Sequence, residues 1–206
     1  LTTWMVTWSN RIFIERFLSL ESVGYYSLSV RIAGIISIFS AAFNNAYNPV
    51  FFRLANSSNQ KAAVNTLRKY NYVYIIYVLL LCFSISLFSK DLILMFFDEK
   101  YIEIYYIIPL VSFGYFWSQL TGIVSRSFQQ SKQMKLNMYI SFSTGFINLI
   151  LNYFLIDFFG IWGAIASLIL TMLYSFWVSY FFTKRKCFFI PIDWQKIIPF
   201  VAISAC

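Results

Sequence analysis

The chain has 206 residues, of which 60% are hydrophobic and 12% are charged, whereas soluble domains usually carry about a quarter charged residues. This composition excludes an ordinary water-soluble globule, because only a lipid environment lets so much apolar surface point outward. The formal net charge of +8 comes from lysines and arginines placed mainly between apolar runs, which is typical of membrane orientation and argues against nucleic-acid binding.

Runs of predominantly apolar residues predict a series of membrane-spanning helices, each of which needs about 20 residues to cross the bilayer. In chain order they cover residues 1–20, 23–47, 70–88, 104–124, 136–156 and 161–182, and a seventh, truncated run covers 197–206. We therefore predict an all-α fold in which the whole chain forms one polytopic transmembrane helix bundle. Both chain ends look cut, so we expect the bundle to be part of a longer protein.

The connections between these runs alternate in basic content. The basic ones contain Arg53, Lys61, Arg68 and Lys69, then Arg126, Lys132 and Lys135, then Lys184, Arg185, Lys186 and Lys196. The intervening connections lack basic residues or are acidic, and in one of them Asp91, Asp98, Glu99 and Glu103 outnumber Lys90 and Lys100. Because cytoplasmic loops collect lysine and arginine, this alternation predicts that the chain begins on the cytoplasmic side.

Three shorter segments carry structural predictions of their own. Residues 59–69 are basic and compatible with a helix, which predicts a surface helix on the anionic inner leaflet. Residues 92–97 form an apolar patch that we expect to dip into the outer interface. The sixth span has a small residue at every fourth position, which predicts a face that packs closely against a neighbouring backbone. These residues are Gly163, Ser167, Thr171, Ser175 and Ser179.

Polar side chains recur at helical spacing inside three of the spans, where residues three or four apart share a face. In the second span the face consists of Ser27, Arg31, Gly34, Ala42 and Asn45, flanked by Asn44 and Asn48. In the fourth span it consists of Ser112, Tyr115, Gln119, Gly122 and Arg126. In the fifth span it consists of Asn137, Ser141, Thr144, Asn148 and Asn152. Such faces do not suit contact with lipid. They either join helices by hydrogen bonds or line a wet cavity.

Ionisable residues inside spans usually face a bundle interior or a wet cavity. Arg31 has no acidic residue within two turns on its own helix, so its charge must be met by another helix, by water or by an anionic ligand. We expect it to face a ligand cavity. For Arg11 the sequence leaves two alternatives, a pair with Glu15 one turn away or a role in that cavity. Arg126 stands at the inner end of its span, where we expect its side chain to extend to the lipid headgroups.

Signatures of catalysis are missing from the sequence. It has no histidine, which is the commonest general base and metal ligand, and Cys82, Cys187 and Cys206 have no metal or redox spacing. It also has no glycine-rich phosphate loop, serine elbow or Asp-x-Asp sugar-nucleotide motif. We therefore predict that the protein is not an enzyme and uses no metal or cofactor.

Several short motifs occur in an order that extends across six spans. They are SNRIFI at residues 9–14, VGYYS at 23–27, AFNNAYNP at 42–49, FGIWGAIAS at 159–167, preceded by Asn152, and PIDW at 191–194. In these motifs the chain resembles the C-terminal part of the polysaccharide and O-antigen-unit flippases. That family belongs to the multidrug/oligosaccharidyl-lipid/polysaccharide flippase superfamily. That family commonly has Asp where Asn10 stands. The resemblance implies a complete protein of about 12 to 14 spans, with about six of them before Leu1.

The resemblance also implies alternating access, in which two helical bundles enclose a groove that opens first to one side of the membrane and then to the other. The cargo would be an undecaprenyl-pyrophosphate-linked oligosaccharide, moved to the outer leaflet of the bacterial inner membrane. A cationic groove would receive the pyrophosphate, and amides and hydroxyls would bond to the sugars. The expected residues are Arg31 and Arg11 for phosphate, and Asn45, Asn48, Gln119, Asn148 and Asn152 for sugar. Besides substrate and bilayer, the resemblance allows a polysaccharide polymerase and chain-length proteins as partners.

Three alternatives remain open at the level of sequence. A cation-coupled multidrug pump on the same fold would need carboxylates inside the membrane to carry protons or sodium, and only Glu15 approaches that description. A membrane-embedded polysaccharide polymerase or ligase would need a large exported loop with reactive residues, whereas the longest exported loop is short. A non-transporting helical scaffold would show no effect of Arg31 or Asn148 on sugar export.

Overall fold

The computed structural model describes residues 2–188, 190 and 191, and all regular structure in this part of the chain is helical. The helices are α1 (Thr2–Phe17), α2 (Leu20–Ala55), α3 (Gln60–Leu87), α4 (Ser89–Phe96), the 3-10 helix η1 (Glu99–Tyr106), α5 (Ile107–Gln130) and α6 (Met134–Lys186). The predicted all-α fold is therefore confirmed. Within the described residues, α2, α3, α6 and the unit formed by η1 and α5 are long and apolar enough to cross a membrane.

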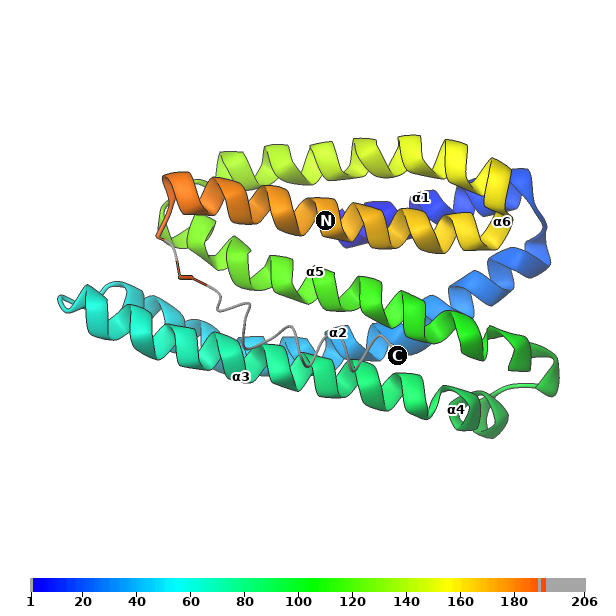
Figure 1. The fold of residues 1–206 in the computed structure, drawn as a ribbon, viewed down its shortest axis with the longest axis horizontal. Coiled ribbons are helices and arrows are strands. Elements are labelled where there is room, and N and C mark those ends of the chain that lie inside the picture. The colour runs from blue at the N-terminus through cyan, green and yellow to red at the C-terminus, as the bar shows by residue number, and fades with distance from the viewer. Residues whose placement is uncertain (1, 189, 192–206) are drawn as a thin grey trace.

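The long helices lie side by side in an elongated bundle (Figure 1). α5 packs against α2, α3 and α6, and α1 packs against α6 and α2. The interior between them is apolar and aromatic, and Phe116, Phe176 and Tyr26 are among its fully buried side chains. Trp117 packs on Phe176, with ring centroids 5.2 Å apart. Because lipid tails are as apolar as these side chains, close packing and hydrogen bonds between helices hold such a bundle together.

α6 consists of two helices joined at a sharp bend. Gly160 has φ +58° and ψ −133°, and Figure 1 shows the chain turning back so that the two arms run antiparallel. Residues with a Cβ avoid positive φ, whereas glycine adopts it readily. The predicted spans 136–156 and 161–182 therefore fall on the two arms of one helical hairpin.

Replacing Gly160 by Ala is expected to lower the free energy of unfolding by about 1 to 2 kcal/mol, the usual cost of a left-handed conformation for a residue with a Cβ. Gly122→Ala is the matched control, because a Cβ at Gly122 would meet nothing within 4 Å and alanine is the better helix former. Thermal unfolding of both variants in the same detergent checks the difference. Equal losses of stability would contradict the conformational role of Gly160.

The two ends of the bundle differ in charge. The α2–α3 turn, the α5–α6 turn and the end of α6 lie at one end, whereas the α1–α2 turn, α4, η1 and the bend in α6 lie at the other (Figure 1). The first, which we call the basic end, has Arg53, Lys61, Arg68, Lys69, Lys132, Lys135, Lys184 and Arg185 at or near it. The second, the acidic end, has Glu15, Glu21, Asp91, Asp98, Glu99, Glu103 and Asp157 with Arg16, Lys90 and Lys100. The alternation along the sequence thus becomes a separation of charge in space.

Of the two segments predicted to lie at the membrane surface, one takes a different form in the structure. Residues 59–69 do not make a separate surface helix, because α3 begins at Gln60 and continues unbroken to Leu87. Asn59 caps this helix by accepting a hydrogen bond from the backbone N–H of Ala62 at 3.2 Å, and Leu67 is buried within the bundle. Most of residues 92–97 belong to α4, a short helix with large exposed apolar side chains.

The boundaries of the predicted spans also shift. α1 has 16 residues and ends at Phe17, because Ser19 caps α2 by accepting a hydrogen bond from the backbone N–H of Ser22 at 3.2 Å. α2 continues through Pro49 to Ala55, past the predicted end at residue 47. The predicted seventh run, 197–206, lies outside the described residues.

Candidate functional site

Arg31 is exposed on α2 and lines a hollow of about 270 Å³. Gly24 and Ser27 precede it on successive turns of α2, and Phe97 and Tyr101 line the hollow from the segment between α4 and α5. Within the part of the chain that the structure describes, no carboxylate forms an ion pair with Arg31. A guanidinium in this position can receive an anion with two parallel hydrogen bonds.

A second cation lies close to this hollow. The Nζ atom of Lys100 is 5.0 Å from the centroid of the Tyr101 ring, and Tyr101 lines the hollow. Tyr25 packs edge-on against the same ring, with centroids 5.8 Å apart. The sequence analysis placed Lys100 in an acidic connection and did not select it. Only the fold of that connection brings Lys100 against Tyr101, a residue that lines the same hollow as Arg31.

Asn45 shares the exposed side of α2 with Arg31 but lies far from the hollow. It follows Arg31 by 14 residues, which returns an α-helix to nearly the same orientation after a rise of about 21 Å. Its side chain is exposed. The predicted polar face of α2 is therefore an exposed strip with Arg31 near one end and Asn45 near the other.

We expected the Arg126 side chain to extend outward, and in this the prediction is wrong: the side chain turns into the bundle and is only 5% exposed. Its Nε donates to Oδ1 of Asn48 at 3.0 Å, and its Nη2 donates to Oδ1 of Asn44. The guanidinium carbon lies 4.8 Å from the ring centroid of Tyr47 and 5.8 Å from that of Tyr74. We call these five residues the Arg126 cage. Its amide oxygens and ring faces solvate the charge inside the bundle.

Hydrogen bonds continue from the Arg126 cage towards the acidic end. Asn44 donates to the hydroxyl of Tyr74 at 3.4 Å, which donates to Oε1 of Gln119 at 3.2 Å. Gln119 in turn donates to Oγ of Ser37 at 3.2 Å. Gln119, a predicted sugar-binding residue, therefore joins α2, α3 and α5 in this conformation.

Asn148 and Asn152 are completely buried, together with Asn10. Both donate to Oδ1 of Asn10, at 3.2 and 2.7 Å, and Asn10 donates to the hydroxyl of Tyr26 at 2.7 Å. The network, which we call the asparagine cluster, also includes Ser9, Ser167, Thr171 and the carbonyl oxygen of Ala164. It connects α1, α2 and both arms of α6. Here the predicted amide ridge faces neighbouring helices and not a cavity.

The small-residue face of the sixth predicted span, which forms the second arm of α6, is buried as predicted. Its members are Gly163, Ser167, Thr171, Ser175 and Ser179. Ser167 and Thr171 belong to the asparagine cluster, where they bond to Asn152 and Asn148 of the other arm. Their short side chains let the two arms of α6 come close enough for these bonds.

Arg11 is half-buried on α1, with its guanidinium carbon 5.5 Å from the centroid of the Trp8 ring. Its Nε is buried and has no hydrogen-bond partner among the described residues. Glu15 is exposed and forms no ion pair with Arg11 in the described structure. Of the two alternatives that the sequence left open, the local pair is therefore not formed.

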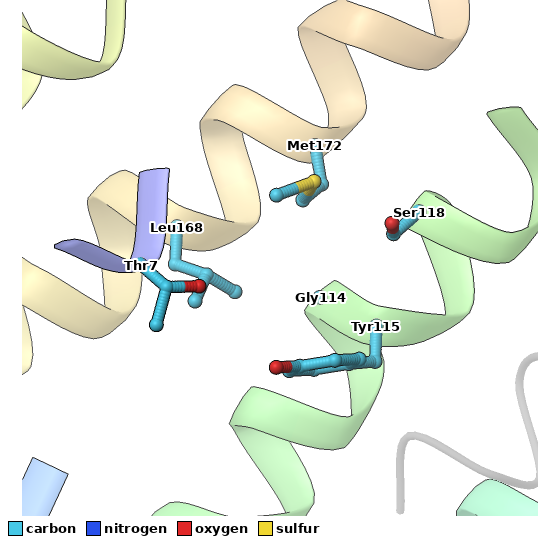
Figure 2. Close-up of a pocket in the computed structure, with 6 residues that line it drawn as sticks. All are labelled: Thr7, Gly114, Tyr115, Ser118, Leu168 and Met172. Atoms are coloured by element: carbon cyan, nitrogen blue, oxygen red, sulfur yellow. The ribbon is translucent and has the colours of Figure 1, made fainter. Parts of the chain in front are cut away.

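A crevice where α1, α5 and α6 meet is too narrow for a water molecule (Figure 2). Its lining consists of Thr7, Gly114, Tyr115, Ser118, Leu168 and Met172, none of which is a predicted site residue. A Cβ at Gly114 would lie 2.2 Å from Cδ2 of Leu168, so glycine permits the close approach of α5 to α6. The crevice is a tight helix contact and not a ligand site.

These features define a class of protein. Long apolar helices enclose polar clusters, and the two ends of the bundle carry opposite charge. Arg31, which has no ion-pair partner among the described residues, lines a hollow within a candidate membrane span. These are features of multi-pass membrane transporters. The model of the MatE family matches residues 1–154, so the chain belongs to the MatE family, transporters of the multidrug/oligosaccharidyl-lipid/polysaccharide flippase superfamily. This membership confirms that the protein is not an enzyme. Comparison with curated proteins and with solved structures gave no match.

Proposed function

We propose that the protein belongs to the polysaccharide branch of this superfamily and moves an undecaprenyl-pyrophosphate-linked oligosaccharide from the cytoplasmic to the outer leaflet. The observation that supports this most is the position of Arg31. It follows the first residue of α2 by 11 residues, which places it about 16 Å along the helix axis, near the middle of a hydrocarbon core about 30 Å thick. A charge at that depth is stable only against water, protein or an anion.

The pyrophosphate is the part of the cargo that such a site suits. A guanidinium binds phosphate oxygens in a planar, two-pronged geometry that an ammonium group does not reproduce. In this proposal Arg31 and Arg11 bind the pyrophosphate, Lys100 adds positive charge beside the hollow, and Asn45 contacts sugar. Asn48, Gln119, Asn148 and Asn152 are bonded to other helices here, so they would reach sugar only after the bundle rearranges.

The distribution of carboxylates argues against the cation-coupled drug pump. Coupling to protons or sodium requires carboxylates held inside the membrane. Every carboxylate among the described residues is exposed and lies towards the acidic end, including Glu15 in the last turn of α1. The asparagine cluster is neutral, with Asn10 at the position where related flippases commonly have Asp. We infer that the change between the inward-open and outward-open conformations is driven by substrate binding and not by protonation or sodium binding at a buried carboxylate.

The charged ends support an orientation, and the proposed cargo supports a location. With the positive-inside rule, the basic end faces the cytoplasm, and so does the start of α1. The membrane is the bacterial inner membrane, where lipid-linked sugars are assembled on the cytoplasmic face. A polysaccharide polymerase and chain-length proteins would then act on the exported product at the acidic end.

Reconstitution of the full-length protein into liposomes tests this function. A fluorescent undecaprenyl-pyrophosphate oligosaccharide is placed in one leaflet, and its arrival in the other is followed with a membrane-impermeant quencher. The proposal expects transfer without an imposed sodium or proton gradient. Ethidium is the competing cargo: gradient-driven ethidium transport without lipid transfer would replace the flippase by the drug pump.

A further inference from the structure

The Arg126 cage holds a positive charge that no described residue neutralises. Arg126 is 5% exposed and forms no ion pair with any carboxylate in the described structure. Its partners are two amide oxygens and two aromatic rings. Neutral groups solvate a cation but leave its charge in place, and an unneutralised charge within a membrane protein is costly enough to suggest a function.

The cage also has more hydrogen-bond donors than acceptors. A guanidinium carries five N–H donors, and the Nη1 of Arg126 is buried without a partner among the described residues. Next to the cage, Tyr47 donates to Oδ1 of Asn71 at 3.2 Å, and the Nδ2 of Asn71 is likewise buried without a partner in the described structure. Unfilled N–H groups around a cation suit the oxygen atoms of an anion.

Space lies beside Arg126 on its own helix. Gly122 stands one turn before it on the same face of α5. Gly122 is exposed, and a Cβ there would meet nothing within 4 Å. Asn48, which bonds to Arg126, is itself only half-buried, and Pro49 beside it is exposed. Because the hydrogen-bond partners of Arg126 are the amides of Asn48 and Asn44, an incoming anion would displace neutral groups and not a carboxylate.

Arg126 lies close to the basic end of the bundle (Figure 1). It precedes Gln130, the last residue of α5, by four residues, which is about 6 Å along the axis. The basic residues of the α5–α6 turn, Lys132 and Lys135, follow directly. With the basic end at the membrane surface, the lipid phosphates of that leaflet would lie at this level, whereas Arg31 stands 24 residues before the last residue of α2.

We propose that the Arg126 cage is a second phosphate-binding site, which receives the phosphate of a lipid in the leaflet at the basic end. Asn48 follows Arg31 by 17 residues on α2, so the two sites lie about 26 Å apart along that helix. Resting on the proposed function, this arrangement gives the pyrophosphate one binding site near the leaflet where it starts and another at mid-membrane. The same chemistry also fits the headgroup of an anionic phospholipid.

Binding measurements on the full-length protein in phosphatidylcholine nanodiscs test the site and identify the source of the phosphate. One arm adds undecaprenyl pyrophosphate, and the other replaces part of the phosphatidylcholine by phosphatidylglycerol. Arg126→Gln should weaken binding by about tenfold or more in at least one arm, the usual effect of losing charge-assisted hydrogen bonds. An effect on undecaprenyl pyrophosphate assigns the site to the cargo, whereas an effect on phosphatidylglycerol alone assigns it to the headgroup.

Two further variants make the result specific. Gly122→Leu fills the space beside Arg126 and leaves the cage unchanged, so it should weaken the same binding even if Arg126→Gln fails to fold. Arg185→Gln removes an exposed cation from the same end of the bundle, where its guanidinium carbon lies 4.3 Å from the centroid of the Phe181 ring. This variant should change the affinity for either lipid by less than about twofold. Unchanged binding of both lipids in Gly122→Leu, together with no effect of Arg126→Gln where that variant folds, would overturn the proposal.

Arg31→Ala in the same nanodiscs separates this inference from the proposed function. If Arg31→Ala weakens binding of undecaprenyl pyrophosphate and neither Gly122→Leu nor Arg126→Gln affects either lipid, only the second site is rejected. If none of the three variants affects undecaprenyl pyrophosphate, the recognition of pyrophosphate on which the proposed function depends is rejected as well.

Discussion

Export of the lipid-linked oligosaccharide should fall by at least about tenfold when Arg31 is replaced by Ala in the full-length protein, because charge-assisted hydrogen bonds contribute about 1.5 to 3 kcal/mol. Arg31 has no ion-pair partner in the described structure, so its removal leaves no carboxylate unpaired. Folding and insertion should therefore persist. Surface polysaccharide, normalised to the amount of protein in the membrane, is the measurement.

Two substitutions accompany this experiment. Arg31→Lys keeps the charge but loses the planar two-pronged geometry, so it should retain part of the export. Arg185→Ala removes an exposed cation that lies outside the hollow and should leave export near the normal level. Full export by Arg31→Ala would refute the assignment of Arg31 to the substrate.

Replacement of Asn152 by Leu is expected to cost the most stability of the substitutions considered, about 2 to 3 kcal/mol. The amide bonds to Ser9, Asn10, Asn148 and Ser167. Hydrogen bonds between membrane helices contribute about 0.6 kcal/mol each on average, and the buried groups left without partners add to the loss. Unfolding of the purified protein in mixed micelles measures the effect.

Asn45→Leu is the matched control for that substitution. The chemical change is the same, but Asn45 is exposed and bonds to no other described side chain. Its stability should stay within about 0.5 kcal/mol of the parent. A loss in Asn152→Leu no larger than that in Asn45→Leu would mean that the asparagine cluster does not hold α1 to α6.

The sequence predicted the helices well because each long apolar run can satisfy its backbone in lipid only as a helix. It placed their ends less well. Pro49 was expected beyond the end of the second span, yet α2 continues to Ala55, where Phe51 is buried against its neighbours. Asn59 begins α3 directly and not a surface helix. Local capping and packing decided these boundaries, and apolar periodicity does not report either.

The asparagine cluster and the Arg126 cage were predicted only in part, because their hydrogen bonds join segments that are distant in the sequence. The periodic amides showed correctly that Asn148 and Asn152 do not suit lipid, but periodicity alone does not distinguish a cavity from a neighbouring helix. Asn10, the shared acceptor, is 142 residues from Asn152. Arg126 bonds to side chains 78 and 82 residues away, so its position near the end of α5 did not reveal that the side chain turns into the bundle and not outward.

Thiol labelling at position 31 tests most directly whether a watery hollow holds positive charge inside the membrane. Arg31→Cys is made in a full-length protein whose native cysteines, among them the buried Cys82 and the half-buried Cys187, are replaced by serine. The account predicts reaction with a charged, membrane-impermeant thiol reagent, because the hollow beside position 31 would admit water. Reaction only with a lipid-soluble reagent would place the residue in hydrocarbon and contradict the mechanism.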